Sequence, residues 1–235
     1  MILLCLIFSI EAKIDSLKML LDKQPEVSTV IQLNKCYLQK GEFSNGINLI
    51  KKYEERFESE GKPILIYCLG EDYFFAGKII LARDEYLKVV SRFPDSEIAN
   101  NALERLYLIE YARKDTSLLK RLANSICLYE TEQFDIAKDS LTVLLKTIIG
   151  DYAYYYLALL YYTEGKLPLA LSALYELNNS FPEHKIRNAT LLLVEINLRL
   201  NNKKDAQKIL EDLIIKEPNS IYAARARRML KENLE

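Results

Sequence analysis

The chain has 235 residues, of which 50% are hydrophobic and 28% are charged, and it contains only 7 Gly and 6 Pro. So few turn-forming residues leave little room for β-hairpins and favour helices joined by short loops. The 32 Lys and Arg residues nearly balance the 33 Asp and Glu residues, and a net charge of −1 gives no basic surface for nucleic acid or anionic lipid.

The N-terminal residues form an apolar run at 2–10 that is too short to span a bilayer as a helix, so no stable membrane span is expected. The run has the length of the apolar region of a secretory signal, but no Lys or Arg precedes it. Residues 1–12 are therefore interpreted either as part of a signal peptide or as a first helix that packs on the rest of the chain.

Two successive segments, 27–60 and 63–94, then show the spacing of paired helices. The second segment reads Ile66-x2-Leu69-Gly70-x2-Tyr73, then Ala82-x3-Tyr86, then Pro94. Small residues, Gly70 and Ala82, allow two antiparallel helices to approach closely, and Pro94 ends the second helix. This spacing resembles the tetratricopeptide repeat (TPR) pattern, with Ile in place of the usual Trp.

An additional helix is predicted at 95–114, because apolar residues recur there at helical spacing and either Asp95 or Ser96 can cap its N-terminus. It is either a lone extra helix or a repeat whose second helix has been lost. A weaker repeat follows at 118–150, so 113–117 is expected to form a bend between two sub-arrays.

Two further repeats lie near the C-terminus. In them, 36 residues separate Ala170 from Ala206, and 36 separate Pro182 from Pro218. The tail at 219–233 is predicted as a capping helix with a basic outer face, of the kind that keeps a repeat array soluble.

These repeats predict an all-α, right-handed α-α superhelix (a TPR solenoid) of about ten to twelve helices. Each helix pair buries its apolar face only by stacking on its neighbours. Residues 13–114 are predicted as an N-terminal sub-array that includes the extra helix, and residues 115–235 as a C-terminal sub-array that includes the capping helix.

Two repeat junctions, at 91–102 and 217–226, share a Pro-x-Ser sequence followed by small residues. This form resembles bacterial envelope TPR proteins, such as the lipoprotein of the outer-membrane β-barrel assembly machine and the coordinator protein of the Tol–Pal system. The resemblance implies a periplasmic or envelope-associated adaptor that holds partner proteins. The chain has no lipobox, which departs from the lipoprotein members; outside this resemblance, a cytoplasmic location is expected.

The sequence shows no motif for catalysis, for a cofactor or for a metal. The four Cys are isolated from one another, and His184 is the only histidine. Adjacent acidic residues such as Glu71 and Asp72 point in different directions on a helix and cannot grip one substrate. The chain is therefore expected not to be an enzyme and to bind neither a cofactor nor a metal.

The 16 Tyr are the most informative residues for binding. On the first helix of each repeat, the face beside the packing seam would line the concave surface, and Tyr suits such a surface because it has an apolar body and a polar tip. The same residues can instead pack between helices, and both interpretations stay open. The candidate partner-binding residues are Tyr67, Glu71, Phe74, Tyr129, Tyr152, Tyr155, Leu159 and Tyr162, with Leu119, Leu122 and Ile126 at the same offset in the weaker repeat.

The function predicted from these features is a non-enzymatic protein–protein interaction scaffold that binds a partner protein or peptide on the concave, tyrosine-lined face of a TPR array. The Lys and Asn residues with which chaperone-binding TPR proteins clamp a peptide's C-terminal carboxylate have no counterpart here. The alternative is a structural or self-assembling TPR array in the cytoplasm that makes contacts through its ends.

Overall fold

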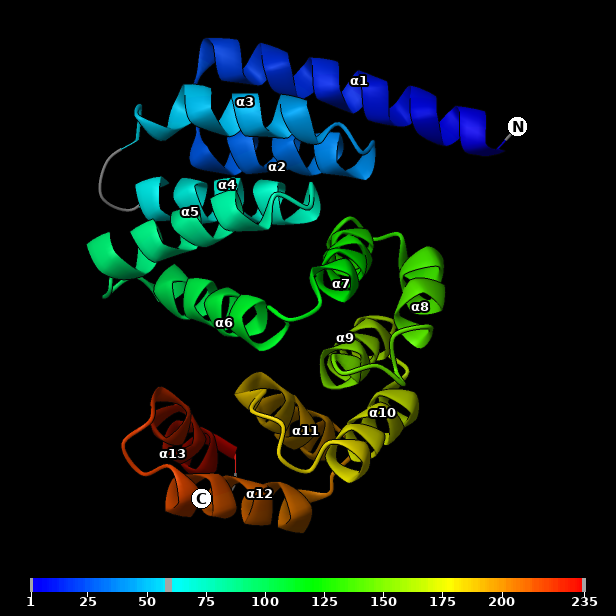
Figure 1. The fold of residues 1–235 in the computed structure, drawn as a ribbon, viewed down its shortest axis with the longest axis vertical. Helices are drawn as coiled ribbons and strands as arrows, with labels where there is room; N and C mark the ends of the chain where they lie inside the picture. The colour runs from blue at the N-terminus through cyan, green and yellow to red at the C-terminus, as the bar shows by residue number, and fades with distance from the viewer. Residues whose placement is uncertain (1, 58–60, 234–235) are drawn as a thin grey trace. The chain divides into compact units, whose positions relative to one another are not determined.

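The protein is described by a computed structural model that covers residues 2–57 and 61–233, with the side chains of 2–9 and 233 left undescribed. These residues form thirteen α-helices and no β-strand (Figure 1). The all-α prediction is confirmed, with one helix more than the upper end of the predicted range. The helices are α1 (Ile2–Lys23), α2 (Val27–Gln39), α3 (Phe43–Glu54), α4 (Gly61–Phe75), α5 (Ile79–Arg92), α6 (Glu97–Tyr111), α7 (Thr116–Glu130), α8 (Phe134–Thr142), α9 (Gly150–Thr163), α10 (Leu167–Ser180), α11 (Arg187–Arg199), α12 (Lys203–Lys216) and α13 (Ile221–Asn233).

The helices divide into two compact units, residues 1–133 (unit 1) and 134–235 (unit 2). Each unit is built from α-α hairpins that stack on one another, which is the packing of an α-α superhelix. The sequence placed the boundary between the two sub-arrays after residue 114, from the repeat pattern alone. That boundary concerns repeats and not compact units, and it stays a prediction. Among the described helices, none is both long enough and apolar enough to cross a membrane.

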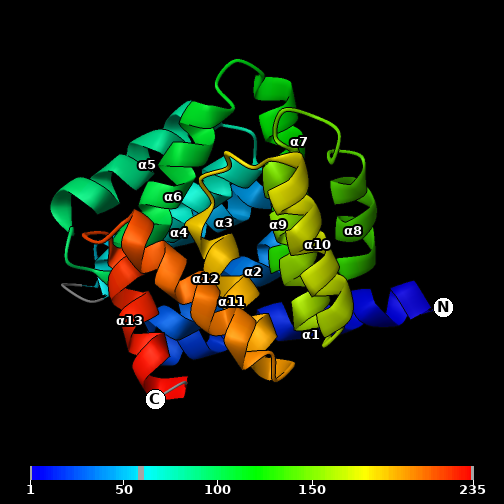
Figure 2. The ribbon, with the colours of Figure 1, turned by 90° about the horizontal axis from the view of Figure 1, so that it is seen from below.

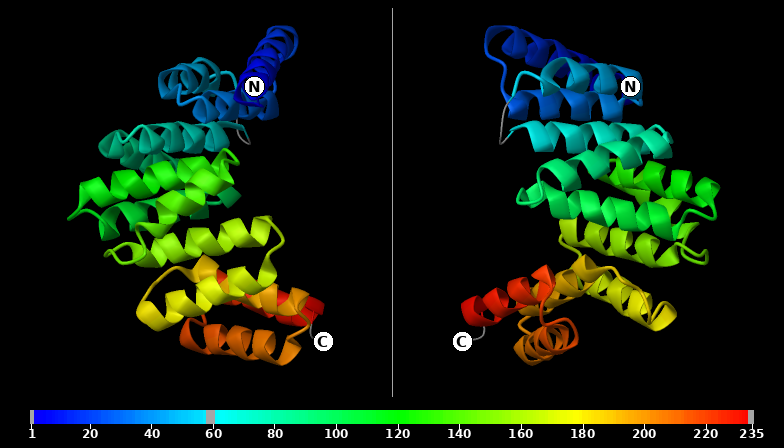
Figure 3. Two further views of the ribbon diagram at one scale, coloured as in Figure 1. Left: turned by 90° about the vertical axis from the view of Figure 1, so that its right-hand side faces the viewer. Right: turned by 60° about the vertical axis from the view of Figure 1, so that its left-hand side comes forward.

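In unit 1, the hairpins α2/α3 and α4/α5 stack through α3 and α4, while α1 packs on α2 (Figures 1 and 3). The helices α2, α4 and α6 lie next to one another as the first-helix layer. The predicted extra helix is α6, which packs on α5 and α4 as the first helix of a further hairpin would. No second helix follows it there, because α7 packs instead against α4 and α2.

Small residues set the distance between the paired helices, as the sequence predicts. A Cβ atom on Gly70 would lie only 2.6 Å from the buried ring of Tyr86 on the facing helix. Ala82, Ala158 and Ala170 are completely buried. The prediction of close helix contacts at Gly70 and Ala82 is confirmed, and Ala158 and Ala170 are buried in the same way.

In unit 2, α9 pairs with α10 and α11 pairs with α12, while α8 packs on α9 (Figures 1 and 2). One core cluster joins α9, α10 and α11, and a second joins α11, α12 and α13. The predicted capping helix is α13, and the hydroxyl of Ser220 accepts a hydrogen bond from the backbone N–H of Ala223 at 3.0 Å. This is the geometry of an N-cap.

Candidate functional site

The predicted binding residues on α4 lie mostly in the interior of unit 1. Phe74 is completely buried and Glu71 is 9% exposed, while Tyr67 is half-buried, with its ring 5.7 Å from that of Tyr86. Of the two interpretations left open by the sequence, Glu71 and Phe74 therefore follow the one in which these residues pack between helices.

The reason is that α7 covers the first-helix layer of unit 1. The side chains at the same offset on α7, Leu119, Leu122 and Ile126, are completely buried, and Tyr129 is half-buried. At the exposed edge of this contact, Lys35 of α2 forms an ion pair of 2.7 Å with Glu132, just after α7. The chain thus fills this face of unit 1 with one of its own helices.

A buried ionic group lies beneath this contact. The guanidinium of Arg105 on α6 donates two hydrogen bonds, of 2.8 and 2.7 Å, to the carboxylate of Glu71, and the hydroxyl of Tyr86 donates a third. These hydrogen bonds come from neighbouring helices, so the group ties α4, α5 and α6 together. This is a structural arrangement, because both carboxylate oxygens of Glu71 accept hydrogen bonds from Arg105.

Asp72 points away from Glu71, as predicted for adjacent residues on a helix. Its carboxyl accepts a hydrogen bond of 2.8 Å from the side-chain N–H of Asn34 on α2. Asp72 is completely buried, and burial raises the pKa of its carboxyl to about 8. The site can therefore hold a neutral acid at physiological pH.

The predicted residues on α9 are brought together on one side of that helix in unit 2. All four are half-buried and pack in part against the core cluster of α9, α10 and α11. They are Tyr152, Tyr155, Leu159 and Tyr162. Their partial exposure is compatible with a binding face, and their packing with a role between helices, so both interpretations stay open.

An ionic group that the sequence analysis did not anticipate joins this side of α9 to α11. The hydroxyl of Tyr162 donates a hydrogen bond to the carboxylate of Glu195. Arg199 lies over the Tyr162 ring, 4.5 Å from its centroid, and forms an ion pair of 3.1 Å with Glu195. Burial and the bond to Glu195 raise the pKa of Tyr162 to about 12, so this hydroxyl stays protonated and acts as a donor.

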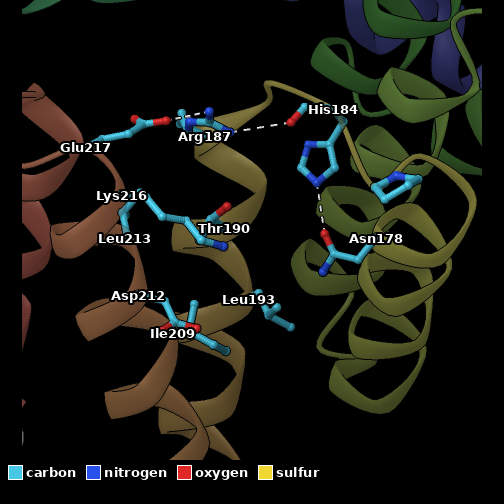
Figure 4. Close-up of a pocket in the computed structure, with 11 residues that line it drawn as sticks. Asn178, His184, Arg187, Thr190, Leu193, Ile209, Asp212, Leu213, Lys216 and Glu217 are labelled. Carbon is cyan, nitrogen blue, oxygen red and sulfur yellow. Dashed lines mark hydrogen bonds and ion pairs between the residues drawn. The ribbon is translucent and has the colours of Figure 1, made fainter.

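A pocket of about 370 Å³ lies elsewhere in unit 2, between α11, α12 and the loop that follows α10 (Figure 4). It has an apolar floor and a rim of polar and charged side chains. The lining residues are Asn178, Pro182, His184, Arg187, Thr190, Leu193, Ile209, Asp212, Leu213, Lys216 and Glu217.

His184 fixes the loop beside this pocket. Its Nδ1 accepts a hydrogen bond of 3.2 Å from the backbone N–H of Ile186, and its Nε2 lies 2.8 Å from Oδ1 of Asn178. Because Nδ1 is an acceptor and Asn178 offers an oxygen, the ring is neutral with its proton on Nε2. Burial and the charge of Arg187 lower the pKa of His184 further. Both ring nitrogens of His184 are thus engaged in contacts that hold the loop.

The charged groups of the pocket differ in their pairing. Arg187 forms an ion pair with Glu217 and contacts the backbone carbonyl of His184 at 3.4 Å. Lys216 extends toward Thr190, whereas Asp212 lies beside Ile209 (Figure 4). Within the described part of the chain, neither Lys216 nor Asp212 has an ion-pair partner. Among the described residues that line the pocket, Lys216 and Asp212 are thus the charged groups available to a ligand.

The remaining groups with reactive chemistry are isolated or buried. Cys36 and Cys127 are free and buried, and burial raises the pKa of each thiol. Among the residues whose side chains the structure describes, no group of three or more His, Cys, Asp or Glu is arranged to hold a metal ion.

Residues 152–184 match the tetratricopeptide repeat family, so the α9/α10 hairpin is a TPR. No curated protein matches the chain. Among solved structures, the chain is similar to the MamA RS-1 ArsTM double mutant, with 17% identity, a TM-score of 0.40, and coverage of 82% of this chain and 94% of that chain.

Two other solved structures are similar at the same level. One is the TPR2AB domain of yeast Sti1 in its complex with an Hsp90 peptide, with 13% identity, a TM-score of 0.42, and coverage of 93% and 88% of the two chains. The other is BtubC from P. vanneervenii, with 12% identity, a TM-score of 0.39, and coverage of 96% and 91%. These likenesses are distant.

Proposed function

We propose that the protein is a non-enzymatic scaffold that binds a segment of a partner protein on the tyrosine-bearing side of α9. The observation that carries this proposal is the contrast between the two units. The corresponding side of α4 in unit 1 is sealed by α7, whereas Tyr152, Tyr155 and Tyr162 on α9 remain half-exposed. The TPR match covers this helix as well.

The chemistry of these residues suits a protein partner. Tyr buries a large apolar area with little loss of side-chain freedom, and a few aromatic residues often provide most of the binding energy of an interface. The neighbouring Glu195 and Arg199 add a polar edge that holds the ring of Tyr162 in place. A rigid aromatic surface with a polar edge is typical of a protein-binding site.

The proposal is tested with the double variant Tyr152→Ala/Tyr155→Ala and with Tyr175→Ala, an exposed tyrosine on α10, as the matched control. The double variant is expected to lose capture of partner proteins from a lysate of the source organism, with little change in melting temperature. The control is expected to capture the same partners as the wild type. A double variant that unfolds, or that captures the wild-type partners, contradicts the proposal.

A second candidate function is a self-assembling array that makes contacts through α6. It is favoured by Tyr107 and Tyr111, which lie one helical turn apart on α6 and are 60% and 51% exposed. An unfolded Tyr152→Ala/Tyr155→Ala variant would support this reading, since the tyrosines of α9 would then serve packing.

We further propose that the protein works in the bacterial cell envelope, in the periplasm. Support for this location comes from the two repeat junctions and from the apolar run at 2–10, most of which lies outside the residues whose side chains are described. Detection of the intact chain, still carrying residues 1–12, in the cytosol of its host would contradict export.

A further inference from the structure

The pocket of unit 2 occupies a place that another repeat fills with its own aromatic side chains. In the α9/α10 repeat, the rings of Tyr154 and Phe181 meet edge to face, with their centroids 6.3 Å apart. The residues 36 positions further along the chain are Thr190 and Glu217, and both line the pocket. An aromatic pair in one repeat is thus replaced by two smaller or polar residues in the next.

In the α11/α12 repeat, the apolar residues around the corresponding position are retained. Leu193 and Leu213 are both 6% exposed, and both line the pocket. Glu217, which also lines it, forms an ion pair with Arg187. The pocket therefore keeps apolar lining residues but has no Tyr or Phe among its described lining residues.

We propose that this pocket binds one aromatic side chain, Trp or Tyr, of a partner segment, together with a carboxylate next to that side chain. The inference rests on the proposed function, because it names the chemistry of the segment that the scaffold would recognise. The volume of about 370 Å³ lies at the lower end of the range for ligand pockets, which fits one large side chain rather than a cofactor.

The charges on the rim specify the polar parts of the ligand. Lys216 has no ion-pair partner in the part of the chain that the structure describes, and it extends toward Thr190, so these two groups offer donors to a carboxylate (Figure 4). Asp212 likewise has no ion-pair partner among the described residues, and its ionised carboxylate can only accept hydrogen bonds. An indole N–H or a phenol O–H supplies the matching donor, whereas Phe and Leu supply none.

The test uses the full chain and N-acetyl-L-tryptophan as the probe, followed by ¹H–¹⁵N NMR. Addition of the probe is expected to shift the backbone signals of Thr190, Leu193 and Leu213 in a saturable way. N-acetyl-L-tryptophan amide lacks the carboxylate and is expected to bind about twofold to fivefold more weakly, because an exposed ion pair adds little energy. N-acetyl-L-leucine is expected to bind more weakly still. Equal binding of all three probes, or absence of saturable shifts, overturns the proposal.

Variants that restore the aromatic pair provide the matched control. Thr190→Tyr/Glu217→Phe is expected to fill the pocket, raise the melting temperature and abolish probe binding. If the double variant does not fold, the single variant Thr190→Tyr, which keeps Glu217, is used in its place to fill the pocket. Lys216→Ala is expected to remove the difference between the acid and the amide probes while leaving residual binding of both. A filled variant that still binds the probe overturns the proposal.

The partner-capture experiment separates this inference from the proposed function. If the filled variant captures partners as the wild type does, while the Tyr152→Ala/Tyr155→Ala variant captures none, the pocket inference fails and the scaffold function stands. If the probe binds the wild-type pocket but the Tyr152→Ala/Tyr155→Ala variant captures the wild-type partners, the proposed binding site on α9 is rejected and the pocket inference is kept.

Discussion

The buried pair of Asn34 and Asp72 contains two oxygens without a hydrogen-bond partner. These are Oδ1 of Asn34 and Oδ2 of Asp72, and both lie beside Gly46, where a Cβ atom would be 2.4 and 2.9 Å from them. Two neighbouring buried acceptors without a donor are costly. One proton on Asp72 removes the cost at both atoms, because the acid can donate to the amide oxygen while it accepts from the amide N–H.

This arrangement predicts that stability depends on pH. The pKa of Asp72 is raised to about 8 in the folded protein, whereas an unfolded Asp titrates near its ordinary value of about 4. Between these values the folded protein holds a proton that the unfolded chain has released. The free energy of unfolding is therefore expected to decrease as the pH rises from about 4 to about 8, by up to about 1.4 kcal/mol per pH unit from this group, and then to level off.

Asp72→Asn tests this prediction, because an amide has the shape of the neutral acid and donates to Oδ1 of Asn34 at every pH. The variant is expected to be more stable than the wild type at pH 8 and to lose the part of the pH slope that Asp72 causes, as measured by urea unfolding at several pH values. Asp72→Ala leaves Asn34 without its partner and is expected to be less stable throughout. An Asp72→Asn variant as unstable as Asp72→Ala at pH 8 would refute a neutral Asp72.

At the scale of the helix, the packing of a repeat depends on its smallest residues. Ala170 is completely buried in the core cluster shared by α9 and α10. Ala170→Leu is expected to lower the free energy of unfolding by about 1–3 kcal/mol, because the added atoms overpack the contact. Ser172→Leu, at an exposed position on the same helix, is the control and is expected to change stability by less than about 0.5 kcal/mol. Equal effects of the two variants in urea unfolding would show that the repeat register is wrong.

These same small residues explain how much of the fold could be predicted from sequence. Gly70, Ala82 and Ala170 mark positions where only a small side chain fits, so their spacing identifies the helix pairs and their contacts. The course of α7 could not be predicted in this way. An apolar stripe such as Leu119, Leu122 and Ile126 shows that a face is covered, but it does not show which helix covers it.

The candidate site was predictable to a similar extent. The side of α9 that bears the tyrosines follows from helical spacing, whereas the burial of Glu71 and Phe74 depends on the unexpected position of α7. The pocket left a signal in the sequence, since Thr190 and Glu217 replace large apolar residues of the preceding repeat. Whether such a replacement leaves a cavity depends on the neighbouring loop, which His184 holds through contacts with Asn178 and Ile186 that the sequence does not reveal.

For the whole molecule, the division into two units predicts that local damage stays local. In repeat arrays each repeat depends mainly on its neighbours, so stability is approximately a sum of local terms. Among the described residues of unit 2, one core cluster joins α9, α10 and α11 and another joins α11, α12 and α13. In unit 1 the Glu71–Arg105 group joins α4, α5 and α6. Each unit thus has buried contacts of its own.

Hydrogen exchange followed by mass spectrometry measures this separation. Ala170→Leu is expected to reduce amide protection in α9 to α12 and to leave α2 to α6 as protected as in the wild type, because free energies of local opening report the packing of each region. Asp72→Ala is expected to show the reverse pattern, with lost protection confined to unit 1. If either variant reduces protection by the same factor in both units, the chain unfolds as one cooperative body, and the two units are not independent in stability.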